Sequence, residues 1–302
     1  MDRFVQFTAY GLTLACVLVL LGLGWVVIYQ VSGVLNLAQG SFLVVGGLTT
    51  TSLAGPAGLP LAVLAGIAAA GALAVGLDRV LLRPARPSGP GGPIIVTLGA
   101  ALVIAEGARS IWGVDPLLLT PYLPREPVNV LGAPVLPHAL LLWGGTAVVV
   151  AGLYLLFEKT LLGRALLACA QNPDGLRLSG TDPLGLRTLA FLMAGVLAGI
   201  AGVLLVPVTP IGWESGLLLG IKGFIAAALG RWTYPGAVAG ALVLGLAENY
   251  AAGYLSSAWK ESVGLGLMLL ILIGRAYASG DGGEGLKSRL LAAFRPPAKA
   301  AS

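Results

Sequence analysis

Long apolar runs, separated by short polar or proline-rich segments, make up most of the sequence. A helix needs about 20 residues to cross the hydrocarbon core of a bilayer, and lipid offers no partner for backbone groups that lie outside a helix. The pattern therefore predicts an all-α, polytopic helical membrane protein with about eight or nine transmembrane or re-entrant helices. The predicted runs are 8–29, 35–54, 59–77, 94–112, 139–157, 188–206, 216–229, 235–250 and 262–277.

The runs form one membrane domain, expected to cover residues 1–279. Residues 280–302 combine Gly-Gly and Pro-Pro pairs with several basic residues, which is typical of a flexible extension. The first run is longer than the apolar part of a secretory signal, no positive segment precedes it, and no small-residue cleavage pattern follows it. We expect it to remain as a transmembrane helix.

Composition supports the membrane assignment. Of the 302 residues, 57% are hydrophobic and 10% are charged, and the mean hydropathy is +0.91; soluble domains carry about 25% charged residues. A single histidine, His138, and two cysteines in unlike contexts give no spacing for a metal centre, a disulfide framework or a catalytic triad. The sequence therefore predicts no cofactor, no metal site and no enzyme active site.

The basic residues indicate the orientation of the chain. Most of the 18 Lys and Arg residues fall in loops that alternate onto one side, among them Arg79, Arg83 and Arg187. Basic loops mark the cytoplasmic side of a membrane protein, so we expect the loop 158–187 and the C-terminus to be cytoplasmic. The net charge of +5 follows from this topology, and no nucleic-acid partner is needed to explain it.

A polar interruption occurs near the start of the second run. Gly33, Asn36, Gln39, Gly40 and Ser41 lie where an apolar helix would otherwise continue. Irregular backbone at membrane depth is tolerated only against protein or a water-filled cavity, so the segment is a candidate helix break beside a solute pathway. Alternatively, the two amides simply hydrogen-bond to a neighbouring helix, because an unpaired buried amide is costly.

Four ionisable residues lie at membrane depth. Glu106, Arg109, Lys222 and Glu248 are each expensive in lipid, so we expect them to face the interior of the helix bundle. Glu106 and Arg109 are three residues apart on one predicted helix and can pair with each other. Lys222 either pairs with Glu248 or extends its ammonium group to the membrane surface.

Glycines recur at helical spacing in two of the later runs. Gly195, Gly199 and Gly202 follow one pattern, and Gly236 and Gly240 another. Small residues at such spacings let helix backbones approach closely in lipid. The pattern predicts a tightly packed bundle and implies no chemistry.

The connector 158–187 is long for a loop between two membrane helices. It predicts an amphipathic helical stretch that ends near Asn172 and Pro173, and a second short segment that runs through Leu176 to Gly180. Long connections of this kind usually have a function of their own.

Three ordered segments resemble the permease subunits of branched-chain amino acid ABC importers. The resemblance covers the chain from about residue 11 to 273. Its marks are the segment 33–40, GVLNLAQG, which is similar to the family's GxxNxAxG signature; the segment 164–180, which is similar to its RA.A.NP..A...G coupling segment; and the segment 220–237 with the following 245–248, which is similar to its G.KAF.AAVLGG.GS.PGA and G..E stretches.

The sequence departs from the family pattern at three places. Gln39 stands where the family usually has histidine, and Ser41 stands where an acid is frequent. The residues 231–234, RWTY, replace the usual glycine-serine turn.

The resemblance implies a multi-pass permease subunit of an ATP-driven importer in a bacterial inner membrane. The implied partners are two ATP-binding cassette subunits, a second homologous permease or another copy of this chain, an extracytoplasmic solute-binding protein and membrane lipid. Branched-chain or related small amino acids are the implied solutes, with urea or short amides as the alternative. The chain has no G-x-x-x-x-G-K-[ST] phosphate loop, so ATP hydrolysis is assigned to the partner subunits.

The resemblance also assigns residues to two roles. The implied lining of the translocation pathway is Asn36, Gln39, Gly40, Ser41, Lys222 and Glu248. The implied ATPase-coupling residues are Arg164, Ala168, Gln171, Asn172, Pro173, Leu176 and Gly180.

Two other classes of function compete with the importer. An ion-coupled secondary transporter or channel would need titratable groups along its path, and Glu106, Lys222 and Glu248 supply a few. A membrane-embedded enzyme would need a histidine cluster, paired intramembrane aspartates or a nucleophilic serine motif, and the sequence offers none of these.

Overall fold

Helices form almost all of the described part of the chain. The computed structural model describes residues 2–84, 91–120, 122–124, 126–130, 133–171, 173–178, 180–254, 256, 262–267, 269–270 and 273. The helices are α1 Asp2–Ser32, α2 Gln39–Leu53, α3 Leu59–Gly76 with its π-helical extension η1 Leu77–Leu82, α4 Gly92–Trp112, α5 Pro137–Lys159, α6 Leu161–Gln171, α7 Pro173–Leu178, α8 Pro183–Leu205, α9 Ser215–Leu229 and α10 Tyr234–Tyr254. The predicted all-α fold is confirmed.

The last predicted run and the tail are covered only in part. Residues 262–267, 269–270 and 273 are helical, as the run 262–277 predicts. The tail 280–302 lies outside the described residues.

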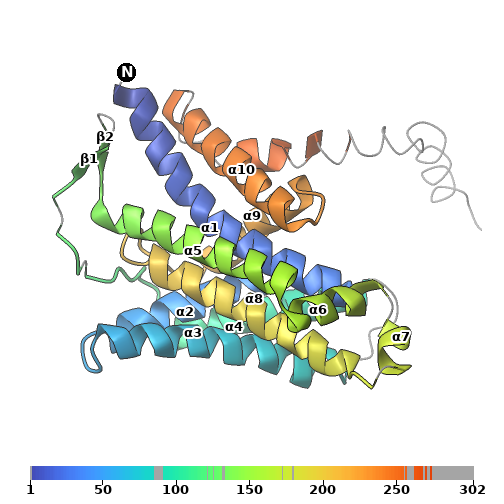
Figure 1. Ribbon diagram of the computed structural model, residues 1–302. Coiled ribbons are helices and arrows are strands. Elements are labelled where there is room, and N and C mark those ends of the chain that lie inside the picture. The colour runs from blue at the N-terminus through green and yellow to red at the C-terminus, as the bar shows by residue number, and fades with distance from the viewer. Residues whose placement is uncertain are drawn as a thin grey trace, which may run out of the picture.

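Helix α1 is the centre of the bundle. Its sequence is apolar on all sides, which is typical of a helix surrounded by protein. It packs against α5, α8, α9 and α10 (Figure 1), and Trp25 in its last third is fully buried. The indole Nε1 of Trp25 donates a 3.0 Å hydrogen bond to the carbonyl oxygen of Gly220 in α9.

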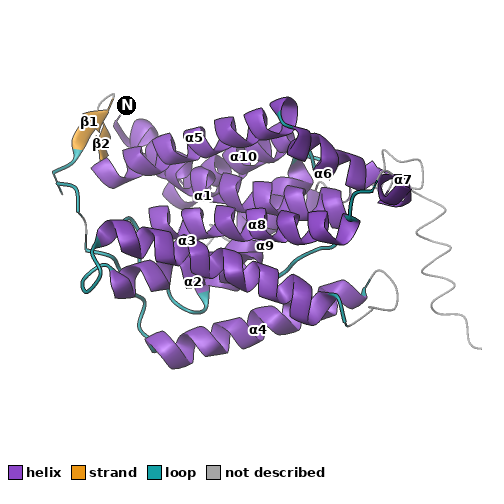
Figure 2. Cartoon of the chain, turned by 60° about the horizontal axis from the view of Figure 1, so that its bottom comes forward, coloured by secondary structure: helices purple, strands orange, loops and turns teal. Residues whose placement is uncertain are grey.

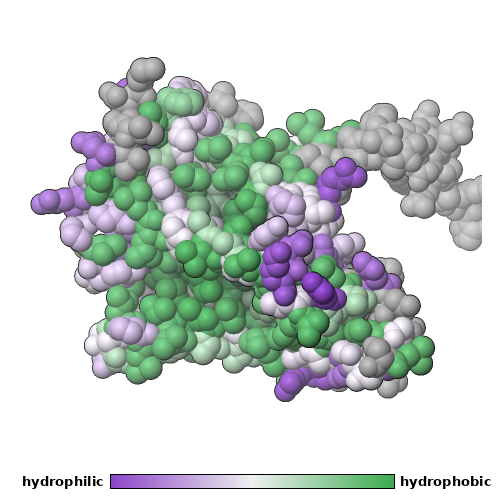
Figure 3. Space-filling model, viewed as in Figure 1, coloured by the Kyte–Doolittle hydropathy of each residue, from purple (hydrophilic) through white to green (hydrophobic). Residues whose placement is uncertain are grey.

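The peripheral helices turn apolar side chains outward. Ile95 and Val103 of α4 are 73% exposed, and Val148 of α5 is 72% exposed. Figure 3 shows hydrophobic residues over much of one face of the molecule. Side chains of this kind are stable only against an apolar solvent, so the outer surface of the bundle faces lipid.

Five described helices are long and apolar enough to cross a membrane, judged by length and composition. They are Arg3–Ser32, Leu59–Leu82, Gly92–Trp112, Pro137–Lys159 and Pro183–Leu205, and Ser215–Leu229 is a shorter apolar helix. The chain is therefore a multi-pass membrane protein.

The glycine pattern of α8 lets it pack closely against two helices. A Cβ on Gly195 would lie 2.7 Å from the carbonyl oxygen of Ala70 in α3, and one on Gly202 would lie 2.2 Å from the carbonyl oxygen of Leu43 in α2. These distances leave no room for a side chain, so α8 packs against α2 and α3 backbone to backbone. The close packing that the sequence predicts is confirmed.

The two ends of the bundle differ in structure. At one end, the strands β1 Val128–Val130 and β2 Ala133–Val135 pair antiparallel in a short hairpin that the sequence did not predict. At the other end, α6 and α7 follow α5 outside the main bundle (Figures 1 and 2). Helix α6 is the helical stretch predicted for the connector 158–187, and α7 lies where the sequence predicts a second short segment.

Replacing Gly202 by alanine should destabilise the bundle. The new methyl group would meet the backbone of α2, and overpacking of this kind costs roughly 1 to 3 kcal/mol. Gly99→Ala in α4 is the matched control, because a Cβ there has no neighbour within 4 Å among the described residues. Thermal unfolding of the detergent-solubilised protein should show a lower Tm for Gly202→Ala alone, and equal Tm values would contradict the close packing of α2 and α8.

Candidate functional site

The predicted helix break is present at the end of α1. Helix α1 ends at Ser32, Gly33 adopts a positive φ of 67°, and the chain stays non-helical until α2 begins at Gln39. A left-handed conformation is readily adopted by glycine. The run 35–54 is therefore not one continuous helix, and its first four residues belong to the break.

The break turns back into the bundle before α2 begins. A Cβ on Gly24 would lie 2.2 Å from the side-chain nitrogen of Gln39, the first residue of α2. Gly24 is about 12 Å before the end of α1, at 1.5 Å per residue. Helix α2 therefore starts beside the interior of α1 and not beside its end. Helix α2 has 15 residues, a length of about 22 Å, which is shorter than the hydrocarbon core. These are the features of a re-entrant or interrupted helix.

The polar side chains of the break are bonded within the chain. Asn36 and Gln39 are both fully buried. The Asn36 Oδ1 accepts from the backbone N–H of Ala38 at 3.2 Å, and the Gln39 Nε2 donates to the carbonyl oxygen of Ala194 in α8 at 2.9 Å. Both amides are therefore hydrogen-bonded within the protein, which is the alternative that the sequence left open. Neither side chain reaches solvent in this structure.

Thr97 of α4 also binds the break, a contact that the sequence did not predict. Its Oγ1 donates to the carbonyl oxygen of Leu35 at 3.1 Å and accepts from the backbone N–H of Leu37 at 3.2 Å. Thr97 is fully buried. Thr97 thus provides hydrogen-bond partners for two backbone groups that lipid could not bind. In the sequence it is marked only as a threonine inside an apolar run.

Glycines let the backbones of the two short helices α2 and α9 approach closely near their first turns. A Cβ on Gly40 would lie 1.7 Å from the carbonyl oxygen of Gly216, and one on Gly220 would lie 3.0 Å from the backbone nitrogen of Gly40. Ser41, also in the first turn of α2, is 5% exposed. The structure thereby brings Asn36, Gln39, Gly40 and Ser41 together beside the start of α9.

Lys222 and Glu248 form a buried ion pair between α9 and α10. The Nζ of Lys222 lies 2.7 Å from the Oε2 of Glu248, and the two side chains are 8% and 0% exposed. Both residues face the bundle interior, as predicted. Removing either partner would leave a buried charge without its counter-ion, whereas the pair itself contributes little net stability.

The other predicted interior pair faces outward. The Glu106 and Arg109 side chains are 60% and 49% exposed, and their nearest charged atoms are 3.4 Å apart. The guanidinium of Arg109 also lies 5.4 Å from the ring centre of Trp213. The expected burial is therefore wrong: these residues lie on the exposed side of the last two turns of α4.

The coupling residues predicted on α6 share its outer face. Arg164, Ala168 and Gln171 are all exposed, and their spacing of four and three residues puts them on one side of a helix. Leu166 and Cys169 on the opposite side are buried against the bundle. Burial raises the pKa of the Cys169 thiol, which keeps it protonated and unreactive.

The remaining coupling residues lie on α7 and the turn after it. Pro173 is the first residue of α7, Leu176 is partly buried, and Gly180 is exposed with a positive φ of 80°. Leu178 is 92% exposed. Asn172 lies outside the described residues.

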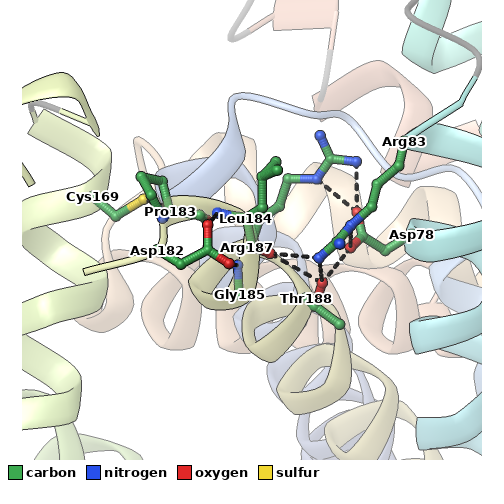
Figure 4. A network of polar contacts seen from close by, with 9 residues as sticks. All are labelled: Asp78, Arg83, Cys169, Asp182, Pro183, Leu184, Gly185, Arg187 and Thr188. Carbon is green, nitrogen blue, oxygen red and sulfur yellow. Dashed lines mark hydrogen bonds and ion pairs between the residues drawn. The ribbon is translucent and has the colours of Figure 1, made fainter. Parts of the chain in front are cut away.

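A buried carboxylate at the same end of the bundle was not predicted. Asp78 on η1 is fully buried and receives bonds from Arg83, Arg187 and Thr188 (Figure 4). In the sequence it is one acid among several basic residues at the end of an apolar run, and nothing there indicates a partner more than a hundred residues away.

The turn between α9 and α10 has an unusual backbone. Arg231 and Trp232 adopt positive φ values of 54° and 59°, which for non-glycine residues cost of order 1–3 kcal/mol each. The ring centres of Trp232 and Tyr29 are 4.1 Å apart. The backbone carbonyl oxygen of Trp232 accepts a hydrogen bond from the Nε2 of Gln30 at 2.8 Å. These contacts hold the turn in which this sequence departs from the usual glycine and serine.

Single replacements in the buried ion pair should be more harmful than a double one. Lys222→Met removes the cation beside a buried carboxylate and should lower stability by about 3 to 5 kcal/mol, and Glu248→Gln should act in the same direction. The double variant should recover part of the loss. Arg109→Met is the control, since an exposed pair is worth at most about 1 kcal/mol. Thermal unfolding checks this, and strictly additive losses would contradict a buried coupled pair.

Sequence comparisons identify the family. The model of the family described as branched-chain amino acid transport system / permease component matches residues 7–272. The chain is 29% identical over 289 residues to the high-affinity branched-chain amino acid transport system permease protein BraD of Pseudomonas aeruginosa, covering 90% of this chain and 94% of that protein. It is 27% identical over 295 residues to the corresponding permease LivH of Escherichia coli, covering 89% and 93%.

A more distant relative shares part of the chain. The L-arabinose transport system permease protein AraH of Escherichia coli is 33% identical over 133 residues, 39% of each chain. No solved structure matches the chain. The family model matches most of the chain, the fold is a helical multi-pass bundle, and a helix is broken at the segment that resembles the family's signature. The chain therefore belongs to the permease component family of branched-chain amino acid transport systems.

Proposed function

We propose that this chain is the membrane-spanning permease subunit of an ATP-driven importer of branched-chain or related small amino acids. An extracytoplasmic binding protein delivers the solute, two ATP-binding cassette subunits supply the energy, and the chain pairs with a homologous permease or with a second copy of itself. The end that carries α6 and α7 faces the cytoplasm. The observation that supports this proposal best is the exposed outer face of α6 and α7 at the basic end of an apolar bundle.

The outer face of α6 and α7 has the composition of a docking surface. Leu161 is 83% exposed and Leu178 is 92% exposed, yet Arg164 and Arg177 lie between them and are exposed too. Charged groups of this kind do not lie in hydrocarbon, so the two leucines are at an aqueous surface. Exposed leucines there are typical of an interaction site, and an ATPase subunit is the partner that the proposed function provides.

The short helices α2 and α9 support a solute path beside the break. Transporters commonly place their binding sites where interrupted helices meet near the middle of the membrane. Here the first turns of α2 and α9 touch through Gly40 and Gly216. We propose that Asn36, Gln39, Gly40 and Ser41, with Lys222 and Glu248, line the path once the bundle rearranges to open it.

The permease scaffold alone does not determine the solute. The relatives that match most of the chain are named for branched-chain amino acids, whereas a partial match is named for L-arabinose. Leucine, isoleucine and valine are the first solutes to test, and urea or short amides are the second.

Changing the outer face of α6 and α7 should uncouple the ATPase. Arg164→Glu combined with Leu178→Asp reverses one charge and removes one exposed apolar side chain, so solute-stimulated ATP hydrolysis by the reconstituted complex should fall at least about tenfold, equivalent to about 1.4 kcal/mol of coupling free energy. Arg79→Glu is the matched control, because Arg79 is another exposed basic residue near the same end. Stimulation that survives the double change would refute the docking surface.

Uptake should depend on ATP and not on an ion gradient. Vesicles that contain the complex should accumulate leucine when ATP is supplied with the gradients collapsed by ionophores. Uptake that persists without ATP and stops with the ionophores would instead favour an ion-coupled transporter, in which Glu248 would be the first candidate for a titrating group.

A further inference from the structure

The carboxylate of Asp78 joins two segments that are far apart in the sequence. Directly after its own segment η1, the Nε of Arg83 lies 3.4 Å from Oδ2. From the first turns of α8, the Nε of Arg187 donates to Oδ1 at 2.6 Å and the Oγ1 of Thr188 donates to Oδ2 at 2.6 Å. One fully buried carboxylate therefore holds η1 and α8 together (Figure 4).

Further bonds fix the same two segments to each other. A guanidinium nitrogen of Arg83 donates to the carbonyl oxygen of Leu184 at 2.8 Å and to the hydroxyl oxygen of Thr188. Two guanidinium groups share one carboxylate, so loss of that carboxylate would leave two nearby cations without an anion.

Asp78 lies in the π-helical segment η1, and its backbone takes part in the widened turn. The backbone N–H of Arg83 bonds to the carbonyl oxygen of Asp78, five residues back, at 2.9 Å. Such widened turns are rare and often occur at functional positions. Arg79 and Val80, the next two residues, are exposed, so the turn separates one buried acid from an outward-facing surface.

The same end of α8 is continuous with the proposed coupling segment. Asp182 caps α8 by accepting from the backbone N–H groups of Leu184 and Gly185 at 3.0 and 2.9 Å. The turn that leads to it is closed by a 3.3 Å bond from the N–H of Thr181 to the carbonyl oxygen of Leu176 in α7. A short hydrogen-bonded turn therefore connects α7 to the capped first turn of α8.

The middle of α8 reaches the helix break. Ala194, whose carbonyl oxygen accepts from Gln39, follows Thr188 by six residues, or about 9 Å along the helix. Further along, Gly202 packs directly against Leu43 of α2. One helix thus connects the Asp78 cluster at the basic end with the amides of the break.

We propose that Asp78 is a positioning residue that clamps η1 to the start of α8, so that α3 and α8 move as one body when the ATPase displaces α6 and α7. Through the bond between Gln39 and Ala194, this movement opens and closes the helix break. The inference rests on the proposed function for its energy source, whereas the clamp itself is a property of the permease alone.

Asp78→Asn tests the clamp with Glu106→Gln as the matched control. Both changes remove one carboxylate charge from an ion pair with arginine, one buried and one exposed. In the complete transporter reconstituted with its ATPase and binding protein, Asp78→Asn should keep basal ATP hydrolysis and lower the leucine transported per ATP hydrolysed at least about tenfold. Glu106→Gln should leave this ratio unchanged, and an unchanged ratio for Asp78→Asn would overturn the proposal.

A second measurement separates the clamp from the proposed function. Hydrogen exchange on the permease in nanodiscs should accelerate together in 77–84 and 183–190 for Asp78→Asn, and unchanged exchange in either segment would overturn the clamp. If the wild-type complex shows no ATP-driven uptake, the proposed function fails while this exchange result still decides the clamp. If Asp78→Asn does not assemble, Thr188→Val, which removes one hydroxyl from the cluster, should still lower the transport ratio severalfold, and an unchanged ratio would refute the proposal.

Discussion

The hydrocarbon interior of the bilayer can neither hydrogen-bond to the backbone nor solvate a charge, and the rest of this structure depends on that constraint. It explains why helices make up almost all of the described chain. It also explains why backbone groups of the interruption between Ser32 and Gln39 are bonded to side chains: Thr97 bonds to two of them, and Asn36 bonds to a third. The charges that remain inside are paired, as in Lys222 and Glu248.

Close backbone contact follows from the same constraint. Lipid tails are as apolar as leucine side chains, so helices in a membrane associate through packing and polar contacts and not through hydrophobic exclusion from water. Helix α8 combines both means. Its glycines bring it against α2 and α3, and its first turns bind Asp78. It is therefore suited to carry movement from one end of the bundle to the helix break.

The sequence was sufficient to predict the features that depend on local composition. The apolar runs predicted the helices, the polar residues 33–41 predicted the break, and the glycine spacing of α8 predicted its close packing. The family marks predicted the permease family that the comparisons confirm. The positions of Arg164, Ala168 and Gln171 on one exposed face of α6 agree with a surface role, although their partner is a proposal.

The features that the sequence did not reveal depend on contacts between distant segments. Asp78 pairs with Arg187 across more than a hundred residues, and Thr97 is distinguished only by the backbone that it meets. The burial expected for Glu106 and Arg109 was wrong because apolar run length gives the depth of a residue but not the side of the helix that it occupies. Direction around a helix is determined by the neighbours that pack against it.

The proposed coupling requires α6 and α7 to lie at the cytoplasmic surface, where an ATPase subunit can bind them. The most direct measurement is the reaction of a single cysteine, Arg164→Cys in a chain whose buried Cys16 and Cys169 are replaced by alanine, with a maleimide that does not cross membranes. We expect labelling in inside-out vesicles and none in right-side-out vesicles. The reverse pattern would contradict this orientation.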